Sequence, residues 1–279
     1  MSDSLVALVV ALADDELVLG HRHSEWTGHA PHIEEDVAFS SIAQDEIGHA
    51  AALFRLAAEL TGDDPDRLAL GRAADGYRHA VLCERENDDW AFTLARHWLY
   101  DHADALRLEV LADSKHEPLA ALAEKMRREE RYHLLHADTW MRRVAGGPVE
   151  GRTKLIAATS RVLHDAPGLF EPVELEDEAL AHGWLAVSSG ELRARFEDRT
   201  EKALDELGMP NAAGPAPNER TEFVASSSGD LIAADGLPEE RAAAGDAGLG
   251  GRHGQHSPAF AALWETMTVQ YQAHPGARW

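Results

Sequence analysis

The chain has 279 residues, of which 49 are acidic and 26 are basic, so its formal net charge is −23. This balance argues against charge-driven binding to nucleic acid, which needs clustered basic side chains. A single cysteine, Cys83, rules out a disulfide framework and a thiolate metal cluster. The longest early apolar run, residues 5–13, is too short to span a membrane and lacks a basic leader. We therefore expect an acidic cytoplasmic protein.

The acidic excess and the scarcity of lysine, with only four in the chain, favour adaptation to high salt. Salt screens the repulsion between acidic side chains. Codon usage in a GC-rich genome, which replaces lysine by arginine, would produce the same composition. Both explanations concern the habitat and leave the chemistry open.

Amphipathic segments predict four long helices in the first half of the chain. In chain order they span residues 2–26, 33–61, 88–114 and 117–145. Gly28 and Pro31 separate the first two, and a Gly-Gly-Pro sequence at 146–148 ends the fourth. The second and third helices are joined by a long connection, in which we expect one short helix at about 66–74.

Shorter helices are expected in the second half, at residues 151–166, 189–208 and 257–273. Residues 209–256 are rich in Gly, Ala, Pro and Ser, which predicts an extended or loop segment. No stretch keeps the alternation of a β-strand, so the predicted class is all-α. We expect one domain over residues 1–279, with a four-helix core at 1–147 and a helical, loop-rich extension at 148–279.

Two copies of the pattern Glu-x-x-His, at 46–49 and 130–133, lie in the second and fourth predicted helices. Residues three apart share a helix face, so each copy can present a carboxylate and an imidazole to one metal ion. Each copy interrupts an apolar stripe that faces a core, where an unpaired ionisable group costs several kcal/mol. The stripes are Phe39, Ile42, Glu46, His49, Leu53, Leu56 and Leu60, and Leu119, Leu122, Met126, Glu130, His133, Ala137, Trp140 and Val144.

The first and third helices each carry one carboxylate on a similar stripe, Glu16 and Asp101. Glu16 precedes Glu46 by 30 residues and Asp101 precedes Glu130 by 29, as expected for antiparallel helices that return to one level. This spacing indicates an internal repeat of two helical hairpins joined by a long crossover. The ferritin-like four-helix bundle has this topology, and its di-iron and di-manganese members use this ligand pattern.

Charge balance supports a site for two divalent metal ions, because they would neutralise four carboxylates. Nitrogen and oxygen ligands suit iron, with manganese as an alternative. The predicted ligands are Glu16, Glu46, His49, Asp101, Glu130 and His133. Two further acids, Asp45 and Glu129, are candidates to hydrogen-bond the ligand histidines, although solvent-exposed helix charges would look the same. Chance polar residues, or a site that keeps its ligands but binds no metal, are the alternatives to a metal centre.

The remaining histidines and tryptophans are assigned structural roles. We interpret His23 as a core histidine with a satisfied hydrogen bond; a role as a metal ligand is the alternative. We expect surface or loop positions for His21, His29, His32, His102 and His136, and core packing for Trp26, Trp98 and Trp140. The arginines at 127, 128 and 131 are interpreted as a solvated helix face; binding of an acidic thioester is the alternative.

Two stretches resemble the phenylacetyl-CoA epoxidase family, the ferritin-like subunits of a bacterial multicomponent monooxygenase. They are LGHRHSEWTGHAP at 19–31, and GRHGQHS at 251–257 with the ending PGARW. Both resemble the smaller, structural subunit of that family, which often has a glutamine-type residue where His49 stands. The centre of the chain is instead similar to the catalytic subunit, whose motifs match residues 45–49 and 130–133 and whose carboxylates fall on Glu16 and Asp101.

The resemblance implies epoxidation of the aromatic ring of phenylacetyl-CoA by O₂ at a di-iron site, in aerobic phenylacetate catabolism. It also implies electrons from a separate NADPH-dependent reductase and pairing with a second ferritin-like subunit, in a homo- or hetero-oligomer. We therefore expect an epoxidase subunit that carries its own di-iron site. The alternatives are a non-catalytic scaffold subunit and a stand-alone ferritin-like di-metal oxidase.

Overall fold

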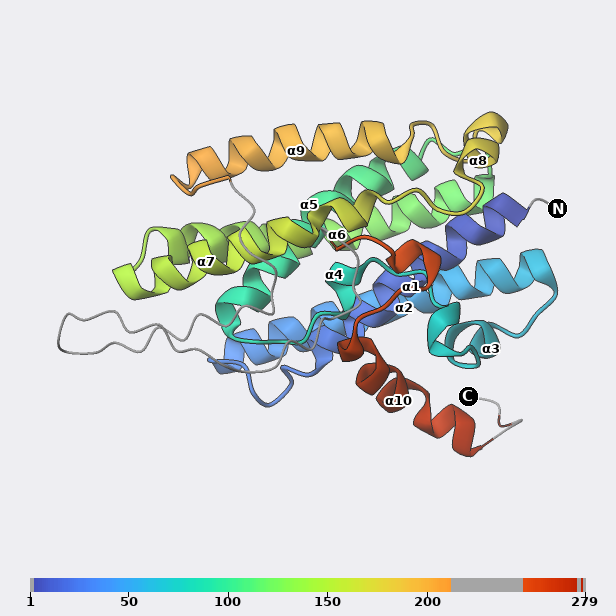
Figure 1. The fold of residues 1–279 in the computed structure, drawn as a ribbon, viewed down its shortest axis with the longest axis horizontal. Helices are drawn as coiled ribbons and strands as arrows, with labels where there is room; N and C mark the ends of the chain where they lie inside the picture. The colour runs from blue at the N-terminus through green and yellow to red at the C-terminus, as the bar shows by residue number, and fades with distance from the viewer. Residues whose placement is uncertain (1–2, 212–247, 275–276, 278–279) are drawn as a thin grey trace, which may run out of the picture.

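Helices α1 (Asp3–Ser24) and α2 (Ile33–Thr61) form one antiparallel hairpin, and α5 (Trp90–Leu111) and α6 (Glu117–Ala145) form another (Figure 1). The computed structural model describes residues 3–211, 248–274 and 277. The described residues contain helices and turns but no strand, so the predicted all-α class is confirmed. The two hairpins and the long connection between them make the ferritin-like bundle expected from the internal repeat.

The bounds of the long helices follow from local signals in the sequence. Asp89 caps α5, because its side chain accepts a hydrogen bond from the backbone N–H of Phe92 at 2.9 Å. Gly62 ends α2 in the left-handed conformation, with φ of 77°, and its N–H bonds the carbonyl of Ala58. Helices α2 and α6 have the predicted bounds, whereas α1 ends at Ser24, two residues earlier than predicted.

The crossover between the hairpins differs from its prediction. The short helix expected at about 66–74 is present but ends earlier: α3 (Pro65–Leu70) stops at Gly71, and a separate 3-10 turn, η1 (Ala74–Gly76), follows it. A further short helix, α4 (Val81–Glu84), was not predicted, and all four of its residues are buried. Such short segments have too few residues for a periodic pattern to reveal them.

The extension consists of α7 (Val149–Asp165), the 3-10 turn η2 (Ala166–Phe170), α8 (Glu176–His182), α9 (Ser189–Glu206), the turn η4 (Gly251–His253) and α10 (Pro258–Ala273). Helices α7 and α9 pack against α5, and α10 packs beside the crossover (Figure 1). The short helix α8 was not predicted. The predicted loop at 209–256 falls largely on residues 212–247, which lie outside the described residues.

Residues 250–257 bind the crossover and α1 through buried contacts. Arg252 is 3% exposed and donates to both carboxylate oxygens of Asp15, at 2.9 and 2.6 Å. The backbone of Gly251 passes so close to the carbonyl of His79 that a Cβ atom would lie 2.2 Å from that oxygen. The short motif at 251–257 therefore joins the end of the chain to the bundle.

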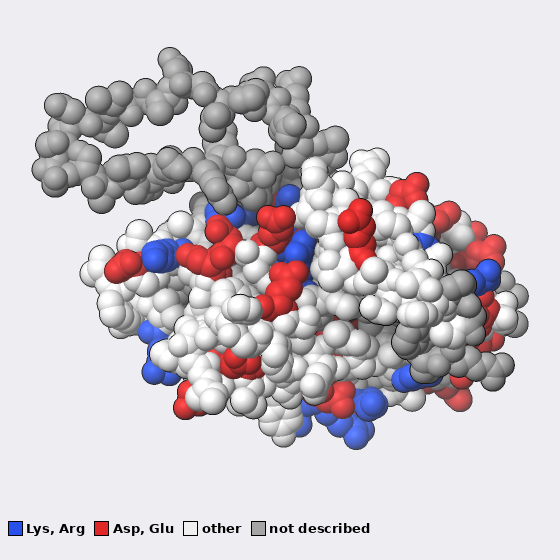
Figure 2. Space-filling view, turned by 90° about the horizontal axis from the view of Figure 1, so that it is seen from below, with Lys and Arg blue, Asp and Glu red and all other residues white. Residues whose placement is uncertain are grey.

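Acidic and basic side chains are scattered over the face seen in Figure 2, with uncharged surface between them. They do not gather into one basic patch on that face. Within the described part of the chain, no helix combines the length and apolar character needed to cross a membrane.

Candidate metal centre

All six side chains predicted as metal ligands are buried, and none is more than 4% exposed. They come from the four long helices of the bundle, because each stands on the stripe that its helix turns toward the core. They are Glu16 in α1, Glu46 and His49 in α2, Asp101 in α5, and Glu130 and His133 in α6.

Glu16, His49 and Glu130 form the closest group, with one ligand-type atom from each within 4.8 Å of the others. Nδ1 of His49 lies 3.2 Å from Glu16 Oε2 and 3.8 Å from Glu130 Oε1. His133 joins this group, because its Nδ1 lies 3.0 Å from Glu130 Oε1. Three helices thus converge on the Glu130 carboxylate.

Glu46 and Asp101 lie beside other histidines. Oε2 of Glu46 is 2.9 Å from Nδ1 of His23, which is fully buried, as predicted for a core histidine. Oδ2 of Asp101 is 3.3 Å from Nδ1 of His97, one helical turn earlier in α5. Each of these carboxylates therefore has one buried imidazole next to it.

Both acids predicted to support the histidines do contact them, and they do so crosswise. Glu129 in α6 lies 2.8 Å from Nε2 of His49 in α2. Asp45 in α2 lies 3.2 Å from Nε2 of His133 in α6. A carboxylate can only accept, so each Nε2 donates and each neutral imidazole keeps its lone pair on Nδ1. These lone pairs face the inner carboxylates, and such an arrangement is repulsive unless a cation lies between them.

The pKa values of these buried side chains also indicate that the carboxylates lack a positive charge between them. Burial alone would lower the pKa of His49, but the hydrogen bond and charge of Glu16 raise it to about 9. Burial would likewise lower the pKa of His133, but the charge and hydrogen bond of Glu130 raise it to about 11. Burial raises the pKa of Asp101 to about 7 and that of Glu46 well above its usual range. Without a metal ion, protons have to supply the positive charge.

Several atoms of these side chains have no hydrogen-bond partner among the described residues, although they are buried. Unpartnered buried polar atoms are rare in native proteins and need an explanation. They are Glu46 Oε1, both carboxylate oxygens of Asp101, Glu130 Oε2 and Nδ1 of His133. Carboxylate oxygens and imidazole nitrogens are the donors that iron and manganese accept, so the residues present fit a metal centre.

Three consecutive acids in α1 are all buried, and they have different partners. Asp14 pairs with Arg72, and Asp15 pairs with both Arg107 and Arg252. Glu16, by contrast, contacts no arginine or lysine of the described chain. Successive residues of a helix point about 100° apart, so only Glu16 faces the histidines.

Two residues of the site were not predicted. Tyr100 is 2% exposed, and its hydroxyl donates to Glu16 Oε1 at 2.7 Å. Asp104 is also 2% exposed; it lines a small apolar cavity together with Glu16, and burial raises its pKa well above the usual range. The spacing of Asp101 and Asp104 on one face of α5 is a signal that could have identified Asp104. No sequence pattern marks Tyr100.

The surface position predicted for His102 is wrong, because His102 is 5% exposed and its Nε2 lies 3.1 Å from Asp138. His136 is half-buried and contacts Glu35 at 2.8 Å, so its predicted surface position is also wrong. Helices α6, α7 and α9 together surround α5, which leaves almost no exposed face on that helix. Trp98 is fully buried as predicted, and Trp26 and Trp140 are partly buried.

Comparison with known proteins places these helices in a family. A family model described as phenylacetic acid catabolic protein matches residues 1–223, which include the four long helices and all six predicted ligands. The chain is also 29% identical over 278 residues to one of the subunits of 1,2-phenylacetyl-CoA epoxidase from Escherichia coli (strain K12). That match covers 99% of this chain and 100% of the relative. The chain therefore belongs to the phenylacetic acid catabolic protein family.

Proposed function

We propose that this chain is a subunit of a multicomponent phenylacetyl-CoA-type ring epoxidase and holds a di-iron centre of its own. Its family and its similarity to an epoxidase subunit support the first part. The second part rests on one observation, the crosswise pairs of Glu129 with His49 and Asp45 with His133. They turn two imidazole lone pairs toward buried carboxylates that have no permanent cation.

The residues that would hold the metal ions are Glu16, Glu46, His49, Asp101, Glu130 and His133. When bound, iron would supply the redox chemistry that O₂ activation needs. Glu129 and Asp45 fix the tautomer and the orientation of the two histidines. The Tyr100 hydroxyl holds one oxygen of Glu16, which leaves the other to face His49.

Apolar side chains exclude water on one side of the centre. The cavity beside Glu16 is lined by Leu12, Leu53, Leu108 and Met126, among other apolar residues. Apolar surroundings of this kind strengthen electrostatic interactions at the two carboxylates of the lining, Glu16 and Asp104. In this proposal a second ferritin-like subunit and an NADPH-dependent reductase complete the enzyme, and the substrate is a CoA thioester.

Metal analysis tests the centre directly. The full-length protein, first treated with a chelator, is loaded anaerobically with Fe²⁺ and compared with the double variant Glu46→Ala/His133→Ala. We expect the wild type to bind two more iron ions per chain than the variant. His29→Gln, an exposed histidine outside the bundle, is the matched control. A difference of less than one iron ion would contradict the proposal.

A non-catalytic scaffold is the second candidate, and the contact of Glu46 with His23 favours it. Because Oε2 of Glu46 already has a buried imidazole partner, Glu46 can have a purely structural role. In the complex reconstituted with its partner subunits, a scaffold predicts unchanged turnover for Glu46→Ala and His133→Ala. An active centre in this chain predicts a large loss of turnover for both variants.

A further inference from the structure

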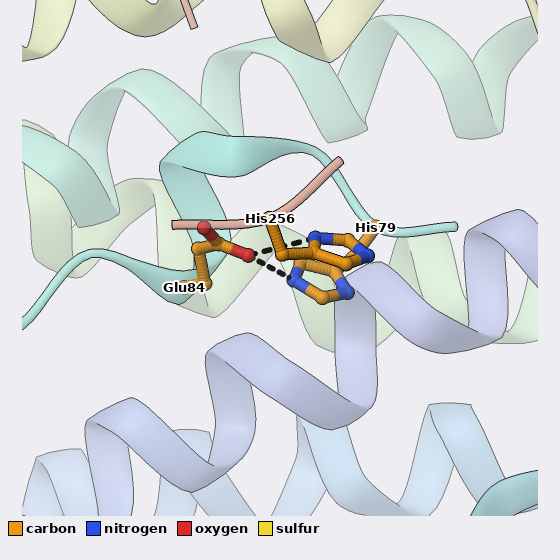
Figure 3. A group of neighbouring side chains, drawn as sticks. All are labelled: His79, Glu84 and His256. Atoms are coloured by element: carbon orange, nitrogen blue, oxygen red, sulfur yellow. Dashed lines mark hydrogen bonds and ion pairs between the residues drawn. The ribbon is translucent and has the colours of Figure 1, made fainter. Parts of the chain in front are cut away.

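A second group of ligand-type side chains lies where the crossover meets the end of the chain (Figure 3). His79 and Glu84 are fully buried, and the side chain of His256 is 6% exposed. Oε2 of Glu84 is 2.7 Å from Nε2 of His79 and 2.8 Å from Nδ1 of His256. Two imidazoles therefore point at a single carboxylate oxygen, as Figure 3 shows.

The carbonyl of Tyr77 fixes the tautomer of His256. Nε2 of His256 lies 3.1 Å from this oxygen, and a carbonyl can only accept, so Nε2 carries a hydrogen. The neutral imidazole then directs the lone pair of Nδ1 at the Glu84 carboxylate. This is the same arrangement as at His49 and His133, and it too requires a cation between nitrogen and oxygen.

The described residues supply no permanent cation to this carboxylate. Three other buried acids, Asp14, Asp15 and Asp165, each pair with arginine. The side chain of Glu84 contacts only His79, His256 and the backbone N–H of Ser257 within the described chain. Arg22 is close, but it donates to the backbone carbonyl of Glu84 instead.

His79 is suited to act as a second nitrogen ligand. Without a metal ion its Nε2 donates to Glu84, at 2.7 Å, but its Nδ1 has no hydrogen-bond partner in the part of the chain that is described. The proton can therefore move to Nδ1 without breaking another hydrogen bond, which frees Nε2 for a metal ion. The two rings stack with centroids 4.1 Å apart and an angle of 11° between their planes, so both nitrogens face Glu84 from the same side. Two stacked imidazolium ions would repel each other, whereas one shared cation serves both rings.

We propose that His79, Glu84 and His256 form a mononuclear site for a divalent transition-metal ion, with Zn²⁺ as the best match. Two histidines and one carboxylate are a common protein ligand set for zinc, and the Tyr77 carbonyl supplies the outer hydrogen bond that metal-bound histidines usually have. His256 is 172 residues from Glu84 in the sequence. The ion would tie residues 250–257, and with them Arg252, to the crossover. This site does not depend on the proposed di-iron centre.

Zinc binding by the full-length protein tests the site. Chelator-treated protein is dialysed against ZnCl₂, and the zinc per chain is measured for the wild type, His256→Gln and His253→Gln. His253 is the matched control, because it lies on the same segment and its side chain is 58% exposed. We expect His256→Gln to bind one zinc ion fewer than the wild type and His253→Gln to bind the same number. Equal binding by all three proteins would mean that a proton, and not a metal, joins His256 to Glu84.

Crystals of the wild-type protein give a readout that needs no variant. After soaking in ZnCl₂, an anomalous difference peak at the zinc edge is expected among His79, Glu84 and His256. Peaks confined to the Glu16 group or to surface residues would overturn the proposal, whether or not His256→Gln folds. A peak at the Glu16 group reports on the di-metal centre alone, so the two proposals fail separately.

Discussion

The carboxylate of Glu129, in α6, lies 2.8 Å from Nε2 of His49, in α2, so it supports the histidine of the opposite motif. Asp45 in α2 does the same for His133 in α6. Each Glu-x-x-His motif therefore depends on the acid that precedes the other one. A change at one of these acids should therefore act on the histidine of the other motif, which faces the proposed metal centre, and this effect can be measured.

Replacing Glu129 by glutamine should weaken iron binding about 10- to 100-fold, because the amide holds the His49 tautomer less well. Asp45→Asn should act similarly through His133. Glu124→Gln is the control, since Glu124 lies in the same helix and pairs with exposed Arg127. Competition with a coloured chelator gives the affinities. Equal affinities for the Glu129 and Glu124 variants would show that Glu129 is only an exposed helix charge.

The metal-free protein should lose stability as the pH rises from 6 to 10. The pKa of His49 is raised to about 9 and that of His133 to about 11, so both histidines contribute stability that is fully present below pH 6.5. This stability is lost as the pH rises through about 9 for His49 and about 11 for His133. Asp101, whose pKa is raised to about 7, likewise contributes stability at low pH that is lost as the pH rises through 7. Thermal unfolding of metal-free and iron-loaded protein at each pH tests this. The iron-loaded protein should show the smaller decrease, and a flat metal-free profile would contradict the assignment.

Arg252→Met should destabilise the protein by about 3–5 kcal/mol, because it leaves the buried Asp15 carboxylate with fewer cationic partners. Arg107 remains beside Asp15 at 2.6 Å, so the lower end of this range is expected. Urea unfolding measures the change. Arg193→Met provides the comparison, since Arg193 forms an exposed pair with Glu197 and should change the stability by less than about 0.5 kcal/mol.

Gly20→Ala should disturb the proposed metal centre, whereas Gly48→Ala should leave it unchanged. A Cβ atom on Gly20 would lie 2.9 Å from Cγ1 of Ile47 and 3.2 Å from Cβ of Glu46, so α1 and α2 would have to separate at a predicted ligand. A cost of about 1–3 kcal/mol and weaker iron binding are expected. Gly48 has open space around it, and alanine there should stabilise α2 by up to about 1 kcal/mol. Thermal unfolding and iron titration of both variants test this prediction, and equal effects of the two substitutions would contradict it.

The long helices and their inward faces could be predicted because their apolar stripes repeat over seven or eight positions. The stripes also placed Glu46 and His133 in the core, where the structure has them. Helices α4 and α8 were missed because four and seven residues are too few to show a period. The burial of His102 was missed because it depends on helices that pack around α5 from later in the chain.

The partners of the central side chains were harder to predict than their burial. The contact of Tyr100 with Glu16 joins residues 84 apart, and nothing in the local sequence indicates it. In the sequence, the motif at 251–257 is informative only through its resemblance to a family. Its physical role depends on Arg252 reaching Asp15, which is 237 residues away. Contacts of this range are set by the tertiary fold and leave no periodic pattern in the sequence.

The three consecutive acids of α1 also determine how this helix can sit in the bundle. Turning α1 so that Asp15 took the place of Glu16 would move Glu16 into the place of buried Leu17. It would also bring Ala13 opposite Arg72, so a buried carboxylate and an arginine would each lose a partner. The ion pairs of Asp14 and Asp15 with three arginines therefore favour one rotation of α1 about its axis. The direction of Glu16 toward the histidines is thus set by ion pairs that its two neighbours in the helix form with distant arginines.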